Sequence, residues 1–118
     1  MSTITIKRGD ISLVYFPHSD LITIKLRPVL VVQADRLDTG VSQVLVAMIS
    51  SNLARSSHPA RVTIRIGDPE AAGSGLKLDS VVMGDNLATI DLRLIQARIG
   101  KLADMTAVDN ALRVALGL

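Results

Sequence analysis

Apolar residues occur in short runs separated by polar breaks along most of the chain. Residues 10–16 alternate loosely between apolar and polar side chains, and the run stops at Pro17, which has no N–H to donate to a sheet. Residues 27–33 and 41–49 are rich in Val, Leu and Ile, which is typical of strands buried on both faces. The pattern therefore predicts a first strand, a hairpin loop and two central strands.

The second half of the chain contains three more runs with strand character. Residues 60–66 alternate between polar and branched apolar positions, as expected for a half-exposed strand. Residues 76–83 and 93–102 are the other two, with a short helical turn expected before the last. Residues 67–75 hold three glycines and a proline, and this composition predicts the most flexible loop of the chain.

The end of the chain has a different period. Apolar residues recur at spacings of three and four from Met105 to Ala115, Asp104 can cap a helix that begins at Met105, and Gly117 can end it. About six short strands and this helix predict a mainly β fold. We expect a small antiparallel β-barrel with an amphipathic C-terminal helix packed against it.

Length and composition suit one small globular domain over residues 1–118. Hydrophobic residues make up 48% of the 118 residues and charged residues 20%, which excludes a disordered chain. No apolar run approaches the roughly 20 residues that a membrane-spanning helix needs, and the first residues do not resemble a secretory signal. We therefore expect a cytoplasmic protein.

Composition also narrows the chemistry. The chain has no cysteine, which excludes disulfides, thiolate catalysis and zinc–thiolate sites. Its acidic residues and histidines are not spaced like metal ligands, so we expect neither a metal nor another cofactor. A net charge of +2 is compatible with a polyanionic partner but does not predict one. Tyr15 and Phe16 are the only aromatic residues, so a stacking platform for nucleic-acid bases is not expected.

Two histidines, His18 and His58, are candidates for acid–base catalysis, and each lies beside a proline in an expected loop. Solvated loop histidines without a catalytic role explain the same pattern. The glycines of residues 71–75 lack the Lys-Ser/Thr ending of a phosphate-binding loop. Neither feature by itself identifies a site.

Arg27 and Ser50 stand at strand ends, where polar groups leave the core. Arg27 begins one apolar run, and Ser50, followed by Ser51, ends the next. A guanidinium presents a fixed fork of donors to phosphate oxygens and a neighbouring hydroxyl can orient or relay a proton, so the two suit phosphoryl transfer. The structural alternatives are a salt bridge at the barrel end for Arg27 and a turn hydroxyl for Ser50.

Short motifs occur in a fixed order along nearly the whole chain. They are Lys-Arg-Gly-Asp-Ile (7–11), Phe-Pro (16–17), Arg-Pro-Val-Leu-Val-Val (27–32), Ala-Met-Ile-Ser-Ser (47–51), Asp-Ser-Val-Val (79–82) and Ala-Thr-Ile-Asp (88–91). In sequence and spacing they resemble the PemK/MazF toxins. Each motif is short, but their order and the closing helix make coincidence improbable.

The resemblance implies an SH3-like barrel, a fold shared with the gyrase-poisoning CcdB toxins. It also implies a homodimer, an antitoxin protein as partner, and sequence-specific, metal-independent cleavage of single-stranded RNA. In the family, the arginine of the Arg-Pro motif and the hydroxyl residue that ends the next strand carry catalysis, which places these roles on Arg27 and Ser50. The implied reaction is attack of the ribose 2′-hydroxyl on its neighbouring phosphorus, giving a cyclic phosphate and a 5′-hydroxyl.

Further RNA contacts are expected from basic and polar residues beyond this pair. They are Arg8, His18, Lys25, Ser51, Asn52 and Asn86. Arg8 belongs to a motif with a mainly structural interpretation, in which Gly9 permits a backbone turn and Asp10 bonds locally. Phosphate binding by Arg8 is the alternative for this motif.

Four residues depart from the pattern of many family members. Ser50 stands where many have threonine, which keeps the hydroxyl but loses the methyl group that stiffens the side chain, so weaker catalysis is expected. Ala88 stands where many have arginine. Asp85 and Asn86 replace a Glu-Gln pair, and these changes bear on the RNA contacts at this surface.

Two other functions fit the same fold. One is a non-enzymatic toxin that binds gyrase as the CcdB toxins do, which would account for the altered residues around the RNA surface. The other is a catalytically decayed module that only sequesters an antitoxin. Both retain the barrel and differ from an RNA-cleaving toxin in what Arg27 and Ser50 do.

Overall fold

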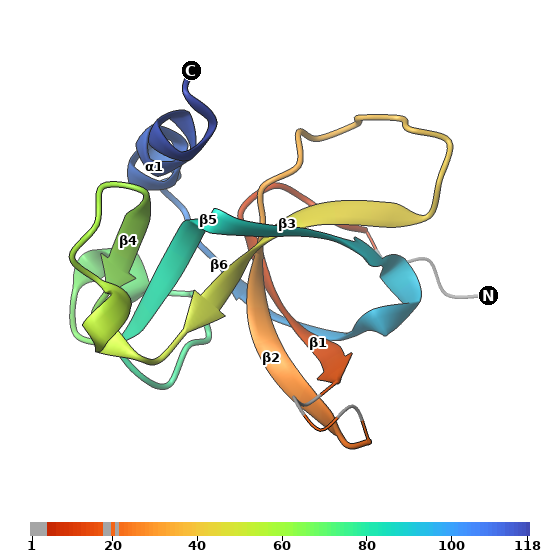
Figure 1. Ribbon diagram of the computed structural model, residues 1–118, viewed down its shortest axis with the longest axis horizontal. Helices are drawn as coiled ribbons and strands as arrows, with labels where there is room; N and C mark the ends of the chain where they lie inside the picture. Colours follow the sequence, from red (N-terminus) through yellow and green to blue (C-terminus); the bar gives the residue numbers. More distant parts are fainter. Residues whose placement is uncertain (1–4, 18–19, 21) are drawn as a thin grey trace.

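The computed structural model describes residues 5–17, 20 and 22–118. Within these residues, six antiparallel strands form one sheet and a single α-helix ends the chain (Figure 1). The strands are β1 (Asp10–Pro17), β2 (Ile24–Val31), β3 (Gln43–Ser50), β4 (Arg61–Ile64), β5 (Ser80–Asp91) and β6 (Ile95–Lys101), and the helix is α1 (Thr106–Leu116). Short 3-10 turns are η1 (Leu53–Arg55), η2 (Pro69–Ala71) and η3 (Leu92–Leu94). The predicted mainly β fold with a C-terminal helix is confirmed.

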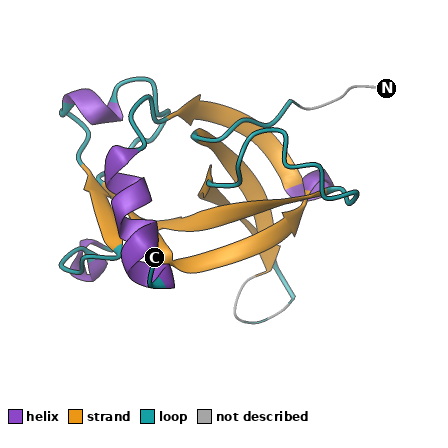
Figure 2. Ribbon diagram, turned by 90° about the horizontal axis from the view of Figure 1, so that it is seen from above, coloured by secondary structure: helices purple, strands orange, loops and turns teal. Residues whose placement is uncertain are grey.

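The sheet has the strand order β4-β5-β3-β2-β1-β6 and curves around the core (Figure 2). Its edge strands β4 and β6 do not pair with each other among the described residues, so the predicted barrel is open on one side. The β4–β5 connection spans this gap, because the Lys101 N–H of β6 donates a hydrogen bond to the Gly73 carbonyl (2.9 Å). Helix α1 packs against β4 and β5.

The two central strands are buried on both faces, as their apolar runs predict. In β2, Val29 and Val31 belong to one apolar cluster and Leu30 to the other. Strand β3 likewise contributes Val46 to the first cluster and Ala47 to the second. Full burial of a branched apolar side chain stabilises the fold by about 1.5–3 kcal/mol, so the buried side chains of these two strands contribute strongly to stability.

Strand β5 is longer than the sequence predicts, because a polar bulge interrupts its pattern. Met48 of β3 pairs with Met83, but its neighbour Ala47 pairs with Leu87, so residues 84–86 have no partner in β3. The strand was expected over residues 76–83, and these three polar or small residues hid its continuation to Asp91. The bulge turns side chains away from the ladder toward one end of the sheet.

Helix α1 begins at Thr106, one residue later than predicted. The Asp104 carboxylate accepts a hydrogen bond from the Thr106 N–H (2.9 Å), and Gly117 ends the helix with a left-handed φ of 71°. Val108 and Ala111 are its buried residues, in keeping with the predicted three- and four-residue spacing.

The loop that its composition marks as flexible is fixed against β6 by close backbone packing. Ser74 is fully buried. A Cβ atom added to Gly75 would lie 2.1 Å from the Ile99 carbonyl oxygen, and one added to Gly100 would lie 2.3 Å from the Gly73 carbonyl oxygen. Gly75 and Gly100 leave room for the two backbones to touch. The sequence alone does not distinguish this role of glycine from flexibility.

We predict that Gly100→Ala lowers the free energy of unfolding by about 1–3 kcal/mol, since its methyl group would overlap backbone atoms that cannot move aside. Gly67→Ala is the matched control, because a Cβ atom there meets nothing within 4 Å. Urea denaturation of both variants measures the difference. Equal stabilities of the two variants would contradict the packing described for this loop.

Candidate functional site

Arg27 and Ser50 lie on facing strands at one end of the β2–β3 pair. Val29 pairs with Met48 in this ladder, and the same antiparallel register continued by two residues sets Arg27 opposite Ser50. Both side chains are partly exposed. Each of them lines both of the hollows that meet at this point.

Pro28 explains why the two strands separate here. The β2–β3 ladder ends at the Val29–Met48 pair, whereas β1 and β2 stay paired as far as Pro17 and Ile24. Because Pro28 has no N–H, it cannot extend a ladder that needs a donor at this position. The Arg-Pro motif therefore opens the space beside the arginine.

The two hollows differ in size and lining. The large hollow, about 510 Å³, is lined by residues 25–28, 49–52 and 75–78 with Leu13, Ser80 and Ile99. The small hollow, about 240 Å³, is lined by Phe16, Arg27, residues 48–50, Arg55, Met83 and Asn86. Apolar side chains and a few polar groups share both surfaces, and the junction of the two hollows is formed by Arg27, Ile49 and Ser50.

The charged residues that line the two hollows are all basic, although the whole chain has a net charge of only +2. Among the described residues that line the two hollows, none is acidic and four are basic: Lys25, Arg27, Arg55 and Lys77. Arg27 forms no salt bridge in the described part of the chain, so the structural alternative for this residue is not observed. A surface of this kind suits a polyanion.

Ser50 has the local role that its strand-end position suggests. Its Oγ accepts a hydrogen bond from the Asn52 N–H (3.1 Å), and the Asn52 side chain in turn accepts one from the Ala54 N–H (3.1 Å). Within the described residues the Ser50 hydroxyl donates to no acceptor. Its proton is therefore available to a bound molecule, while the accepted bond holds the oxygen in place.

An ion pair behind the small hollow holds the turn that follows Ser50. Arg61 donates to both carboxylate oxygens of Asp85 (3.2 and 2.8 Å) and to the Arg55 carbonyl (3.1 Å). The hydrogen bond from Arg61 lowers the pKa of the Asp85 carboxyl below its ordinary value. Asp85 is thus paired with Arg61 of β4, and it is not among the residues that line either hollow.

Most of the residues expected to contact RNA gather at this place. Lys25, Ser51 and Asn52 line the large hollow, and Asn86, carried by the bulge in β5, lines the small one. Ala88, where many family members have arginine, is half-buried against an apolar cluster. The roles of these residues in RNA binding stay predictions.

Arg8 lies elsewhere. Its Nε donates to the Val32 carbonyl (2.9 Å) and its Nη2 pairs with Asp109 (2.6 Å), so it joins the end of β2 to α1. The structural interpretation of its motif is supported, because Gly9 has a φ of 94° and Asp10 accepts bonds from the Lys7 N–H and from Arg98.

Of the two histidines, only His58 lies among the described residues. His58 Nδ1 accepts a hydrogen bond from the Ala60 N–H (3.0 Å), which fixes it in the turn before β4 and outside the lining of both hollows. His18 lies outside the described residues. Two lining residues, Lys77 and Arg55, were missed by sequence reasoning because each sits in a loop or turn whose position depends on distant packing.

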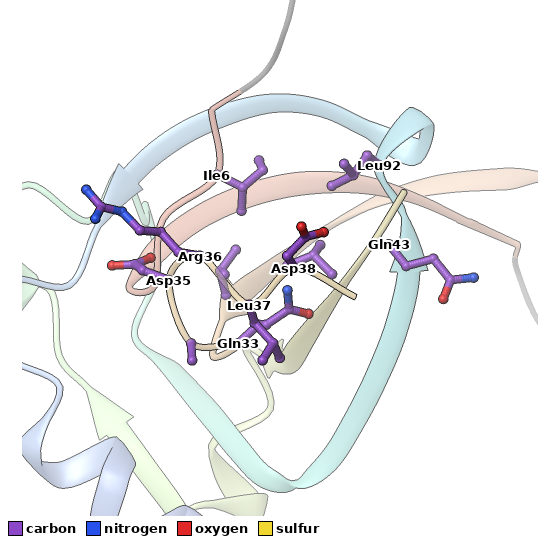
Figure 3. Close-up of a pocket in the computed structure, with 11 residues that line it drawn as sticks. Ile6, Gln33, Asp35, Arg36, Leu37, Asp38, Gln43 and Leu92 are labelled. Atoms are coloured by element: carbon purple, nitrogen blue, oxygen red, sulfur yellow. The ribbon is translucent and has the colours of Figure 1, made fainter. Parts of the chain in front are cut away.

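A third hollow of about 320 Å³ lies at another part of the sheet (Figure 3). Asp35 and Asp38 from the β2–β3 loop line it together with Ile6 and Leu92. Asp35 already accepts a hydrogen bond from the Arg8 N–H (2.7 Å). Two carboxylates and one guanidinium, that of Arg36, line this hollow, so it lacks the purely basic charged lining of the other two hollows.

Two further properties concern the described part of the chain. No group of three or more His, Asp or Glu side chains there is placed to hold a metal ion. None of its helices combines the length and apolar character required to span a membrane. Metal-independent activity remains a prediction.

The open β-barrel, with an Arg-Pro strand that faces a strand ending in a hydroxyl, is the arrangement expected for a small β-barrel toxin. Residues 7–116 match the sequence model of the PemK-like, MazF-like toxins of type II toxin-antitoxin systems. The chain belongs to this family, which confirms the resemblance seen in its motifs.

Individual relatives agree with this assignment. Endoribonuclease EndoA of Bacillus subtilis (strain 168) is 33% identical over 121 residues, which cover 96% of each chain. The toxin MazF-mt6 of Mycobacterium tuberculosis superposes with a TM-score of 0.71 at 26% identity, over 92% of this chain and 97% of that one. An endoribonuclease from a mycobacterial species, solved in complex with its cognate antitoxin, has a TM-score of 0.74 at 22% identity over 97% of both chains, and it shows the shared fold.

We predict that Asp85→Asn lowers the free energy of unfolding at pH 7 by about 0.2–1 kcal/mol, the range of a partly exposed ion pair. Because the folded-state pKa of Asp85 is lowered, the stabilisation is present above the ordinary value of 3.8 and is lost as the pH falls through the folded value. The difference from wild type should therefore shrink below pH 3.8.

Urea denaturation across this pH range is the measurement. Asp68→Asn is the matched control, because Asp68 is exposed and has no salt bridge in the described part of the chain. A difference between wild type and Asp85→Asn that does not change with pH would show that the ion pair is not its cause.

Proposed function

We propose that this protein is the toxin of a type II toxin-antitoxin system and that it cleaves single-stranded RNA at specific sequences without a metal ion. The observation that carries the proposal is the meeting of Arg27 and Ser50 between two hollows whose described lining is basic and not acidic. Family membership and the 33% identity to an endoribonuclease support the same reaction class.

In the proposed reaction, the ribose 2′-hydroxyl loses its proton and attacks the adjacent phosphorus, the bond from phosphorus to the 5′-oxygen of the next nucleotide breaks, and that oxygen takes up a proton, so that no proton is gained or lost overall. The products are a 2′,3′-cyclic phosphate and a 5′-hydroxyl. The Arg27 guanidinium stabilises the negative charge that gathers on the phosphoryl oxygens, because its N–H donors match their geometry. The Ser50 hydroxyl positions the 2′-hydroxyl or relays its proton. Neither group is a good base at neutral pH, so positioning supplies most of the rate.

The surrounding residues place the substrate. Lys25 contributes charge to the large hollow, and Ser51 and Asn52 offer polar groups next to the reacting atoms. The amide of Asn86 in the small hollow can both donate to and accept from a base edge, which suits recognition of a nucleotide.

Two protein partners belong to this proposal: a cognate antitoxin and a second copy of the chain. The support is the family itself and the apolar surface around the site. On the hairpin formed by β1 and β2, Ile22 and Ile24 are 85% and 68% exposed, and Leu78 beside the large hollow is 64% exposed. Exposed apolar surface of this kind marks protein interfaces. Since messenger RNA is the substrate class, we expect the protein to act in the cytoplasm.

The first test compares wild type, Arg27→Ala and Ser50→Ala on a long unstructured RNA in the presence of a chelator. Wild type is expected to cut at a short recurring sequence, and each variant to lose roughly 10²–10³ in rate. The measurement is mapping of the 5′ ends and of the terminal groups. The controls are Arg113→Ala and Ser57→Ala, which also remove an arginine and a serine but at exposed positions outside both hollows.

Intact RNA after incubation with folded wild type would refute the proposal. Gyrase that co-purifies with a still toxic Arg27→Ala variant would then favour the gyrase-binding alternative. Harmless overexpression together with a measurable antitoxin complex would favour the decayed module.

The second test concerns the nucleophile and the hydroxyl. An RNA with a single 2′-deoxynucleotide at the mapped position should resist cleavage there, because it lacks the attacking group. The Ser50→Thr variant should cut unmodified RNA roughly two- to tenfold faster than the wild-type protein does, since the added methyl group restricts the rotamer of the hydroxyl. Single-turnover rates measure both effects. Cleavage at the deoxynucleotide would exclude attack by the 2′-hydroxyl.

A further inference from the structure

Two basic residues that no motif marks lie on opposite sides of the Arg27–Ser50 junction. Lys77 lines the large hollow, and Arg55 lines the small one. Neither forms a salt bridge in the described part of the chain. Their charges are therefore available to a ligand.

Lys77 is carried by a segment that the fold holds in place. Its neighbour Leu76 packs against an apolar cluster, and the Leu76 N–H donates to the Ser74 hydroxyl (3.2 Å). Gly75, the residue before, is in backbone contact with Ile99 of β6. The Lys77 side chain thus extends from a fixed backbone position at the rim of the large hollow.

Arg55 is held by a different set of bonds. It ends the turn η1, which begins at Asn52 with the side-chain cap to the Ala54 N–H. Its carbonyl accepts a hydrogen bond from Arg61 (3.1 Å), which is itself fixed by Asp85. The backbone of Arg55 is anchored on β4 while its guanidinium remains free to face the small hollow.

We propose that Lys77 and Arg55 bind the phosphates on either side of the cleaved linkage, so that one RNA strand passes from the large hollow over Arg27 and Ser50 into the small hollow. This inference rests on the proposed function. Three cationic positions then follow one another along the strand, with the reacting phosphate at the middle one. The absence of acidic side chains from the described lining leaves this path free of repulsion.

Binding measurements test the path independently of cleavage. The probe is a short single-stranded RNA that carries the mapped cleavage sequence with a 2′-deoxynucleotide at the reacting position. Lys77→Ala and Arg55→Ala should each raise its Kd roughly tenfold at low salt. Each should also reduce the slope of log Kd against log salt concentration by about 0.7, the value for one lost phosphate contact on a single strand.

Matched controls separate a local contact from a change in overall charge. Lys101→Ala and Arg113→Ala remove the same charges at exposed positions outside both hollows, and they should leave the slope unchanged. Arg55→Lys keeps the charge and should restore the slope. Urea denaturation shows that each variant is folded.

The order of the two contacts is tested with shortened probes. Removal of the phosphate on the 5′ side of the reacting linkage should abolish the effect of one of the two substitutions, and removal of the phosphate on the 3′ side should abolish the effect of the other. Two results would overturn the inference: a wild-type slope of log Kd against log salt concentration in both variants, or loss of the effects of both substitutions when the same phosphate is removed. If the wild-type protein still binds and cleaves RNA, the proposed function is unaffected by either result. No binding of RNA by folded wild type would overturn both.

Discussion

The end of the β2–β3 ladder is the feature on which the site depends. Val29 and Met48 form its last pair, and the next residue of β2, Pro28, lacks the N–H that another pair requires. Up to this point the two strands are bound to each other and buried on both faces, so their relative position is fixed. Beyond it the ladder ends, and Arg27 and Ser50 line the two hollows that meet there. A rigid sheet thus positions two polar side chains at the end of its central ladder, where water and a ligand can reach them.

The walls of the opening come from segments that the curved sheet brings together. The bulge at residues 84–86 sends Asn86 toward the small hollow. The β4–β5 connection crosses the open side of the barrel, and its contact with β6 through Gly75 and Gly100 sets the rim of the large hollow. Both devices also serve the fold, since the bulge bends β5 and the connection covers the edge of β6. The same interactions therefore stabilise the barrel and shape the site.

Charge is distributed so that the site keeps its positive residues. Five arginines away from the two hollows pair with carboxylates in the described part of the chain, among them Arg8 with Asp109 and Arg98 with Asp10, whereas Arg36 and Arg113 form no such pair there. Partly exposed pairs of this kind stabilise the fold only weakly. These ion pairs matter more for the electrostatic field, because they neutralise arginines outside the hollows. Arg27 and Arg55, which line the hollows, form no salt bridge within the described residues. A protein with a net charge of only +2 can in this way present a strongly positive groove.

The strands, the closing helix, the family, and Arg27 and Ser50 as the pair to examine could all be predicted from the sequence. These follow from local patterns: uninterrupted apolar runs for strands with two buried faces, a three- and four-residue spacing for the helix, and short motifs in a fixed order. Three features become visible only in the folded protein: Arg8 ties the end of β2 to α1, β5 continues through a polar bulge, and Lys77 and Arg55 line the hollows on either side of the junction. Each of these depends on contacts between residues far apart in the chain. The sequence does not distinguish a glycine that permits close backbone contact from a glycine that permits motion. The packing around the glycine decides which role it has.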